Sequence, residues 1–142
     1  MSIADRIKAD VTSALKGGDR GRTSALRLVL SELQKATKEG NADELAVLRR
    51  ERKRRRDAET AYRDANRPEL AEQEAGEAEM IETYLPAELG EGDLEALVRQ
   101  AIADTGAQGP KDMGGVIKRV MAAADGRADG KRVSSAVREA LA

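Results

Sequence analysis

Opposite charges are concentrated in two neighbouring segments of this chain, and their separation restricts its fold more than any other feature. Seven of the eight residues from Arg49 to Arg56 are basic, whereas Pro68 to Val98 holds ten acidic residues and no basic one. Like charges within a helix destabilise it. An antiparallel helical hairpin would bring the two segments together and relieve the repulsion in each. The sequence leaves open whether the arginine run is paired within the chain in this way or binds a partner.

Apolar residues recur at helical spacing and predict an all-α fold. Ala, Leu, Glu and Arg dominate, only three prolines occur, and Phe and Trp are absent, a mixture typical of helical proteins. We expect Leu15 to share the apolar face of the first helix with Ile7. The core stripe predicted for the second helix is Leu26, Val29, Leu30 and Leu33. The first four helices are predicted to begin at Ser2, at Asp19 or Thr23, at Asn41 or Asp43, and at Pro68.

Three shorter helices are predicted after Pro86, each following an aspartate that can accept backbone N–H groups at a helix start. These capping residues are Asp93, Asp112 and Asp129. The segment 87–92 follows Pro86, contains two glycines and is the best candidate for a domain boundary. We therefore predict an N-terminal helical domain at residues 1–86, with a long charged hairpin, followed by a compact three-helix bundle at residues 93–142.

The turn between the last two predicted helices is the best candidate for a binding site. We expect Gly126 and Gly130 to adopt backbone angles that a side chain would oppose. The N-terminus of the last helix offers free N–H groups and partial positive charge, which suit a phosphate. Neither tyrosine lies in this region, so nucleic-acid contacts should be to the backbone rather than through base stacking. Ordinary solvated surface positions are the alternative interpretation. The candidate nucleic-acid-binding residues are Lys118, Arg119, Arg127, Lys131 and Arg132.

Side chains that usually carry catalysis are scarce. The chain has no cysteine and no histidine, which excludes disulfides, thiolate metal ligands and the commonest general base. Glu72, Glu79 and Glu82 form a row that lacks a desolvated pocket, so solvation explains them better than acid–base catalysis. Asp125 and Asp129 lack the alternating oxygen ligands of a calcium loop. We expect no catalytic residue, metal, cofactor or membrane partner and, without a signal peptide or membrane span, a cytoplasmic location.

Four groups of residues, in this order and at these spacings, resemble the GatB/YqeY family. They are Leu26-Arg27-Leu28, Glu82-x-Tyr84-Leu85-Pro86 with Leu89, Lys111-Asp112-Met113-Gly114, and Gly126-Arg127-Ala128-Asp129-Gly130 followed by Val133. The resemblance covers nearly the whole chain and implies kinship with the tail of the B subunit of tRNA-dependent amidotransferases, where the homologous domain contacts tRNA. The kinase-like catalytic portion of that subunit has no counterpart here. A glutamine-dependent carbon–nitrogen ligase label would therefore be inherited from the full-length subunit. Arg52 departs from the family pattern, which tends to place an apolar residue there.

Two functions of different classes follow from these observations. The first is a non-catalytic module or accessory factor that contacts tRNA through its phosphate backbone. The second is an adaptor that binds a protein partner through the charged hairpin or the exposed face of the terminal bundle. An independent enzyme ranks below both.

Overall fold

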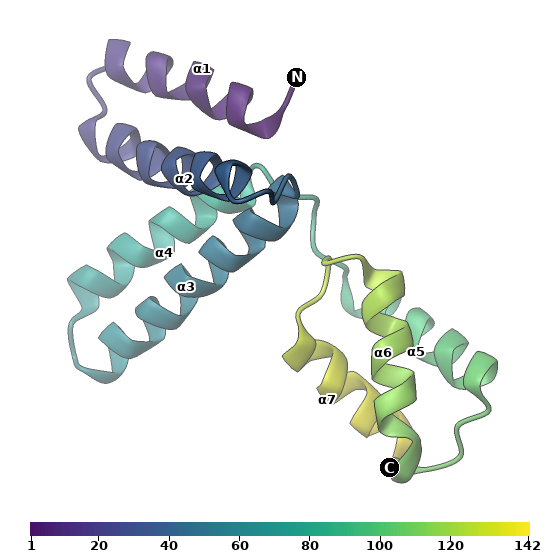
Figure 1. The fold of residues 1–142 in the computed structure, drawn as a ribbon. Helices are drawn as coiled ribbons and strands as arrows, with labels where there is room; N and C mark the ends of the chain where they lie inside the picture. Colours follow the sequence, from purple (N-terminus) through teal and green to yellow (C-terminus); the bar gives the residue numbers. More distant parts are fainter. The chain divides into compact units, whose positions relative to one another are not determined.

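The computed structural model describes every residue from Met1 to Ala142, and all of its regular structure is helical (Figure 1). The chain divides into two compact units, Met1–Leu85 and Pro86–Ala142. The all-α prediction is confirmed, including the long hairpin and the three C-terminal α-helices. The helices are α1 (Ile3–Lys16), α2 (Arg20–Lys38), α3 (Glu44–Asp64), α4 (Pro68–Glu82), α5 (Glu91–Thr105), the 3₁₀ turn η1 (Pro110–Asp112), α6 (Met113–Ala124) and α7 (Gly130–Leu141).

Local capping signals determine where the first four helices begin. The Ser2 hydroxyl accepts the Asp5 N–H, and the carboxylates of Asp19 and Asp43 each accept a first-turn N–H of α2 and α3. Pro68 is the first residue of α4, where its missing N–H costs nothing. These helix starts agree with the predictions. Where the sequence allowed two starting points, the structure selects Asp19 over Thr23 and Asp43 over Asn41.

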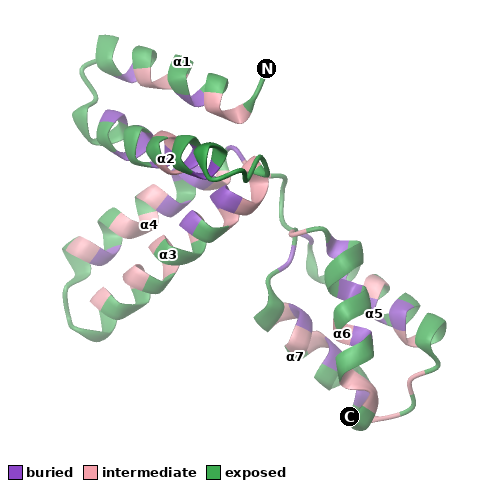
Figure 2. Cartoon of the chain, viewed as in Figure 1, coloured by how far each residue is buried: buried purple, intermediate pink, exposed green.

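The core of the first unit is aliphatic apart from Tyr84, and buried positions recur along its helices (Figure 2). Leu26, Val29 and Leu33 are buried as predicted, while Leu30 is only partly buried. The expectation for Leu15 is wrong, because 52% of this residue is exposed. In the last turn of α1, Ala14 packs into the core in place of Leu15. The chain then reverses direction at Gly17 and Gly18.

Glu44, the first residue of α3, caps the start of α1. The sequence did not reveal this contact. Its two carboxylate oxygens accept the Ile3 N–H at 3.1 Å and the Ala4 N–H at 2.8 Å. The remaining N-terminal donors, those of Ser2 and Asp5, bond to each other's side chains. The four backbone donors that a helix start leaves without partners are therefore all satisfied.

Substituting Glu44 with alanine is expected to lower the free energy of unfolding by about 1–2 kcal/mol, because two partly buried N–H groups lose their acceptor. Urea denaturation followed by circular dichroism measures this loss. Glu72→Ala is the matched control, because Glu72 is exposed on α4 and should change stability by less than about 0.5 kcal/mol. Equal losses in the two variants would contradict the capping role.

The basic helix α3 and the acidic helix α4 pair as an antiparallel hairpin, as their charges predicted (Figure 1). The Arg55 guanidinium lies 3.8 Å from the Glu74 carboxylate and 3.4 Å from that of Glu77. Arg56 donates to Glu82 at 3.0 Å. The acidic row of α4 is therefore not simply solvated, because three of its carboxylates face arginines of α3.

The arginine run also forms pairs within α3. Glu51, only 2% exposed, accepts a hydrogen bond from Arg54 at 3.0 Å and lies 3.7 Å from Arg55. Hydrogen bonds from Arg56 and then Arg63 lower the pKa of Glu59 below its usual range. Four of the seven basic residues from Arg49 to Arg56, namely Lys53, Arg54, Arg55 and Arg56, thus have ion-pair partners within the chain.

Tyr84 joins the end of α4 to α1. Its hydroxyl donates to the Asp10 carboxylate, and the Arg6 guanidinium lies 5.3 Å from the centre of its ring. Burial, together with the hydrogen bond to Asp10, raises the pKa of Tyr84 to about 12. The hydroxyl is therefore neutral at physiological pH and remains a donor, which gives the tyrosine of the Glu82-x-Tyr84-Leu85-Pro86 motif a structural role.

The second unit packs α5, α6 and α7 around a separate aliphatic core, with Val116, Val120, Val133 and Val137 fully buried. The prediction that Asp93 caps α5 is wrong, because the helix begins at Glu91 and Gly90 occupies the capping position. Asp93 instead lies in the first turn, where its charge is favourable to the helix dipole.

Candidate nucleic-acid interface

The turn between α6 and α7 combines two left-handed residues with a side-chain cap. Asp125 (φ 47°) and Gly126 (φ 76°) are the left-handed residues, and the Asp129 carboxylate accepts the Arg132 N–H at 2.8 Å. The predictions for Gly126 and for capping by Asp129 agree with this geometry. The prediction for Gly130 is wrong, because Gly130 is the first residue of α7 and Asp125 takes the unusual backbone angle instead.

Asp112 precedes α6 but does not cap it with its side chain. Its carboxylate accepts the Gln108 N–H at 2.9 Å and thereby closes the loop that leads into η1. The predicted capping bond is therefore wrong, although the helix begins at the next residue. The carboxylate of an aspartate can accept a hydrogen bond from the backbone N–H of an earlier residue as readily as from that of a later one.

Arg127 and Arg132 hold the segment that precedes α5 against the α6–α7 turn. Arg127 Nε donates to the Ala87 carbonyl at 2.8 Å, and the Leu89 N–H donates to the Arg127 carbonyl at 2.7 Å. Arg132 Nη2 donates to the Leu89 carbonyl at 2.9 Å. Arg132 also lies 3.8 Å from the Glu88 carboxylate. These two candidate residues therefore have a structural task inside the second unit.

The other three candidates differ in how available they are. Arg119 Nε lies 3.7 Å from the Asp104 carboxylate and so faces α5. Lys118 and Lys131 are exposed and form no ion pair. The five predicted residues therefore fall into three groups. Arg127 and Arg132 bind the loop before α5, Arg119 forms an exposed ion pair, and the ammonium groups of Lys118 and Lys131 are free.

Three carboxylates of the second unit are engaged by groups within that unit. Asp104 pairs with Arg119, Asp112 binds Gln108, and Asp129 binds Arg132. Further exposed cations without an ion pair were not singled out from the sequence. They are Arg99, Lys111 and Arg138. Their signal in the sequence is only an excess of basic over acidic residues from Arg99 to Ala142.

Two other classes of site find no support in the geometry. No group of three or more acidic, histidine or cysteine side chains is placed to hold a metal ion. None of the helices is both long and apolar enough to cross a membrane. Of the three glutamates that were weighed for acid–base catalysis, Glu72 and Glu79 are exposed, and Glu82 is partly exposed and bound to Arg56.

The fold and surface together define an all-helical protein with a charged hairpin in one unit and exposed basic side chains on the other. The chain belongs to the family of YqeY-like proteins, whose model matches residues 4–141. No curated protein matches the sequence significantly.

Proposed function

We propose that this protein is a non-catalytic accessory factor whose C-terminal unit contacts the phosphate backbone of tRNA. The observation that carries the proposal is the pair of exposed, unpaired ammonium groups of Lys118 and Lys131. Unpaired surface cations attract phosphates without reading sequence. The resemblance to the tail of the tRNA-dependent amidotransferase B subunit supports tRNA as the nucleic acid.

The ion pairs of the first unit favour this proposal over an adaptor that acts through the hairpin. Lys53, Arg54, Arg55 and Arg56 all lie within ion-pair distance of carboxylates of α3 or α4. A partner would have to break these pairs before it could use the arginine run. Lys118 and Lys131 carry no such competing interaction.

The Asp129 carboxylate modifies the phosphate site predicted at the start of α7. It already occupies the capping position and binds the Arg132 N–H, so its negative charge opposes a phosphate at the same point. We therefore place the contact on the exposed lysines and not on the backbone of this helix start.

Substituting both Lys118 and Lys131 with glutamate is expected to weaken tRNA binding at least about tenfold at low ionic strength, because each phosphate contact releases counterions. Filter binding of purified protein to total tRNA at about 50 and 200 mM salt measures the effect. The double variant should also show a shallower dependence on salt. Arg127→Glu is unsuitable for this purpose, because it would break the hydrogen bond to Ala87.

Lys8→Glu/Lys35→Glu is the matched control, because both lysines are exposed in the first unit and the change in net charge is the same. It should bind tRNA nearly as well as the wild type. Absence of binding by the wild type at low salt would overturn the proposal. Equal losses in the two double variants would show that only net charge matters.

A further inference from the structure

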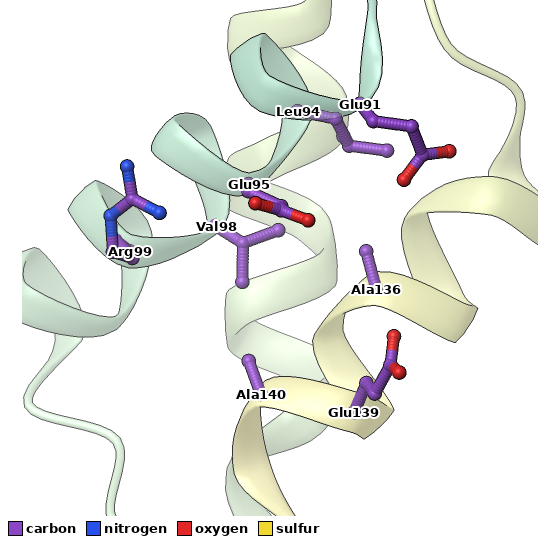
Figure 3. A pocket seen from close by; sticks show the side chains of 8 residues that line it. All are labelled: Glu91, Leu94, Glu95, Val98, Arg99, Ala136, Glu139 and Ala140. Atoms are coloured by element: carbon purple, nitrogen blue, oxygen red, sulfur yellow. The ribbon is translucent and has the colours of Figure 1, made fainter.

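A groove runs between α5 and α7 in the C-terminal unit, and four of its eight lining residues are apolar. Its central hollow measures about 250 Å³ and is lined by Leu94 and Val98 of α5 and by Ala136 and Ala140 of α7 (Figure 3). Each pair lies one helical turn apart, on the same helix face. The two alanines fill little space, so the groove exists because α7 presents small side chains opposite larger ones of α5.

Three carboxylates border this hollow. Glu91 and Glu95 on α5 and Glu139 on α7 direct their carboxylates toward the space between the two helices (Figure 3). Arg99 also lies at the border, but its guanidinium points away from these carboxylates (Figure 3). Neither Glu95 nor Glu139 forms an ion pair, and the Glu91 carboxylate lies 3.9 Å from Arg132. The border therefore carries two carboxylates, those of Glu95 and Glu139, that pair with no cation of the chain.

We propose that this groove binds a basic amphipathic helix of a partner protein. An aliphatic side chain of the partner enters the hollow, and lysines or arginines beside it pair with Glu95 and Glu139. Recognition of a helix by a groove uses this arrangement, with apolar anchors one turn apart and charged residues on either side. Complementary charge steers the encounter and selects the partner.

The same charges argue against nucleic acid as the occupant. A phosphate backbone at this border would face three carboxylates, those of Glu91, Glu95 and Glu139, and the single cation Arg99, and like charges in such proximity repel. The acidic border is thus opposite in charge to Lys118 on α6, while Lys131 lines an adjoining hollow that shares Glu91 and Glu139 with the groove. The proposal does not depend on tRNA binding.

A synthetic helical peptide with leucines one turn apart and lysines on either side provides the probe. Amide chemical shifts of the full-length, isotope-labelled protein are followed as this peptide is added. Amides around Leu94, Val98 and Ala136 should shift. Glu95→Lys/Glu139→Lys should weaken binding about tenfold, because two charge pairs become repulsive. Ala140→Leu, which partly fills the hollow, should weaken it by about threefold.

Two controls make the outcome decisive. Glu72→Lys/Glu79→Lys changes net charge equally at exposed positions of α4 and should leave peptide binding within about twofold of wild type. The same peptide with its lysines replaced by glutamates should not bind. The proposal is overturned if no groove amide shifts at about 1 mM peptide, if both double variants lose binding equally, or if an RNA oligonucleotide shifts the same amides.

Discussion

Arg55→Leu is expected to reduce the stability of the N-terminal unit by about 3 kcal/mol, because it leaves two partly buried carboxylates without a counter-ion. Arg55 is the cation that Glu51, Glu74 and Glu77 share, at 3.7, 3.8 and 3.4 Å. Glu51 would retain Arg54, whereas Glu74 and Glu77 would lose the arginine that faces them. Removing one partner of such a cluster lowers the free energy of unfolding by much more than the intact ion pairs contribute to it on balance.

The loss in Arg55→Leu should depend on pH. Burial raises the pKa of Glu77 in the wild type, and Arg55 opposes that rise. Removing Arg55 therefore raises this pKa further above its unfolded value. A carboxyl group whose folded pKa is raised binds its proton more tightly in the folded state, so the stability of the variant increases as the pH falls through the folded pKa. The difference from wild type should be largest near pH 7 and smaller near pH 4.5.

Urea denaturation at the two pH values measures both effects. Arg50→Leu is the matched control, because Arg50 is exposed on the same helix and its replacement should change stability by less than about 0.5 kcal/mol. Combining Arg55→Leu with Glu74→Gln and Glu77→Gln should recover part of the loss. A loss in Arg55→Leu no larger than in Arg50→Leu would mean that the hairpin does not depend on this cluster.

Val120→Asp is expected to unfold residues 86–142 while residues 1–85 stay folded. Val120 is fully buried in the core of the second unit, and an unpaired carboxylate there costs on the order of 4 kcal/mol or more. A small helical unit has about that much stability to lose. In amide spectra of the full-length variant, signals of the second unit should collapse to unfolded positions, and those of the first should not move.

Ala122→Asp provides the control, because Ala122 is exposed on the same helix. Its cost should be limited to the lower helix propensity of aspartate, about 0.5 kcal/mol. The independent folding of the two predicted domains stays a prediction until this experiment is done. Collapse of both units together in Val120→Asp would show that they fold as one.

Features determined by neighbouring residues were predictable. Ser2, Asp19 and Asp129 lie within three residues of the N–H groups that they cap, so the sequence contains both partners. The hairpin was predictable for a different reason, because a long acidic segment beside a long basic one leaves few other arrangements in which the repulsion is relieved. Asp112 was predicted wrongly since an aspartate near a helix start has more than one donor within reach. Asp93 was predicted wrongly since α5 begins two residues before it, at Glu91.

The candidate site was less predictable than the fold. The sequence placed Arg127, Lys131 and Arg132 together as phosphate-binding residues, but it could not show that the guanidinium groups of Arg127 and Arg132 would bind the carbonyls of residues about 40 positions earlier. The groove between α5 and α7 was missed altogether. Its carboxylates come from two helices distant in sequence, and no local motif connects them.

The sequence by itself determined the helices, their pairing in the hairpin and the family, because these depend on periodicity, local caps, charge segregation and short motifs. Only the tertiary structure decided which charged side chains are free. Glu44 caps a helix about 40 residues away, and Glu51 is buried beside two arginines, while Lys118 and Lys131 remain in solvent. Long charged side chains reach whichever partner packing brings near, so their roles depend on contacts between distant segments.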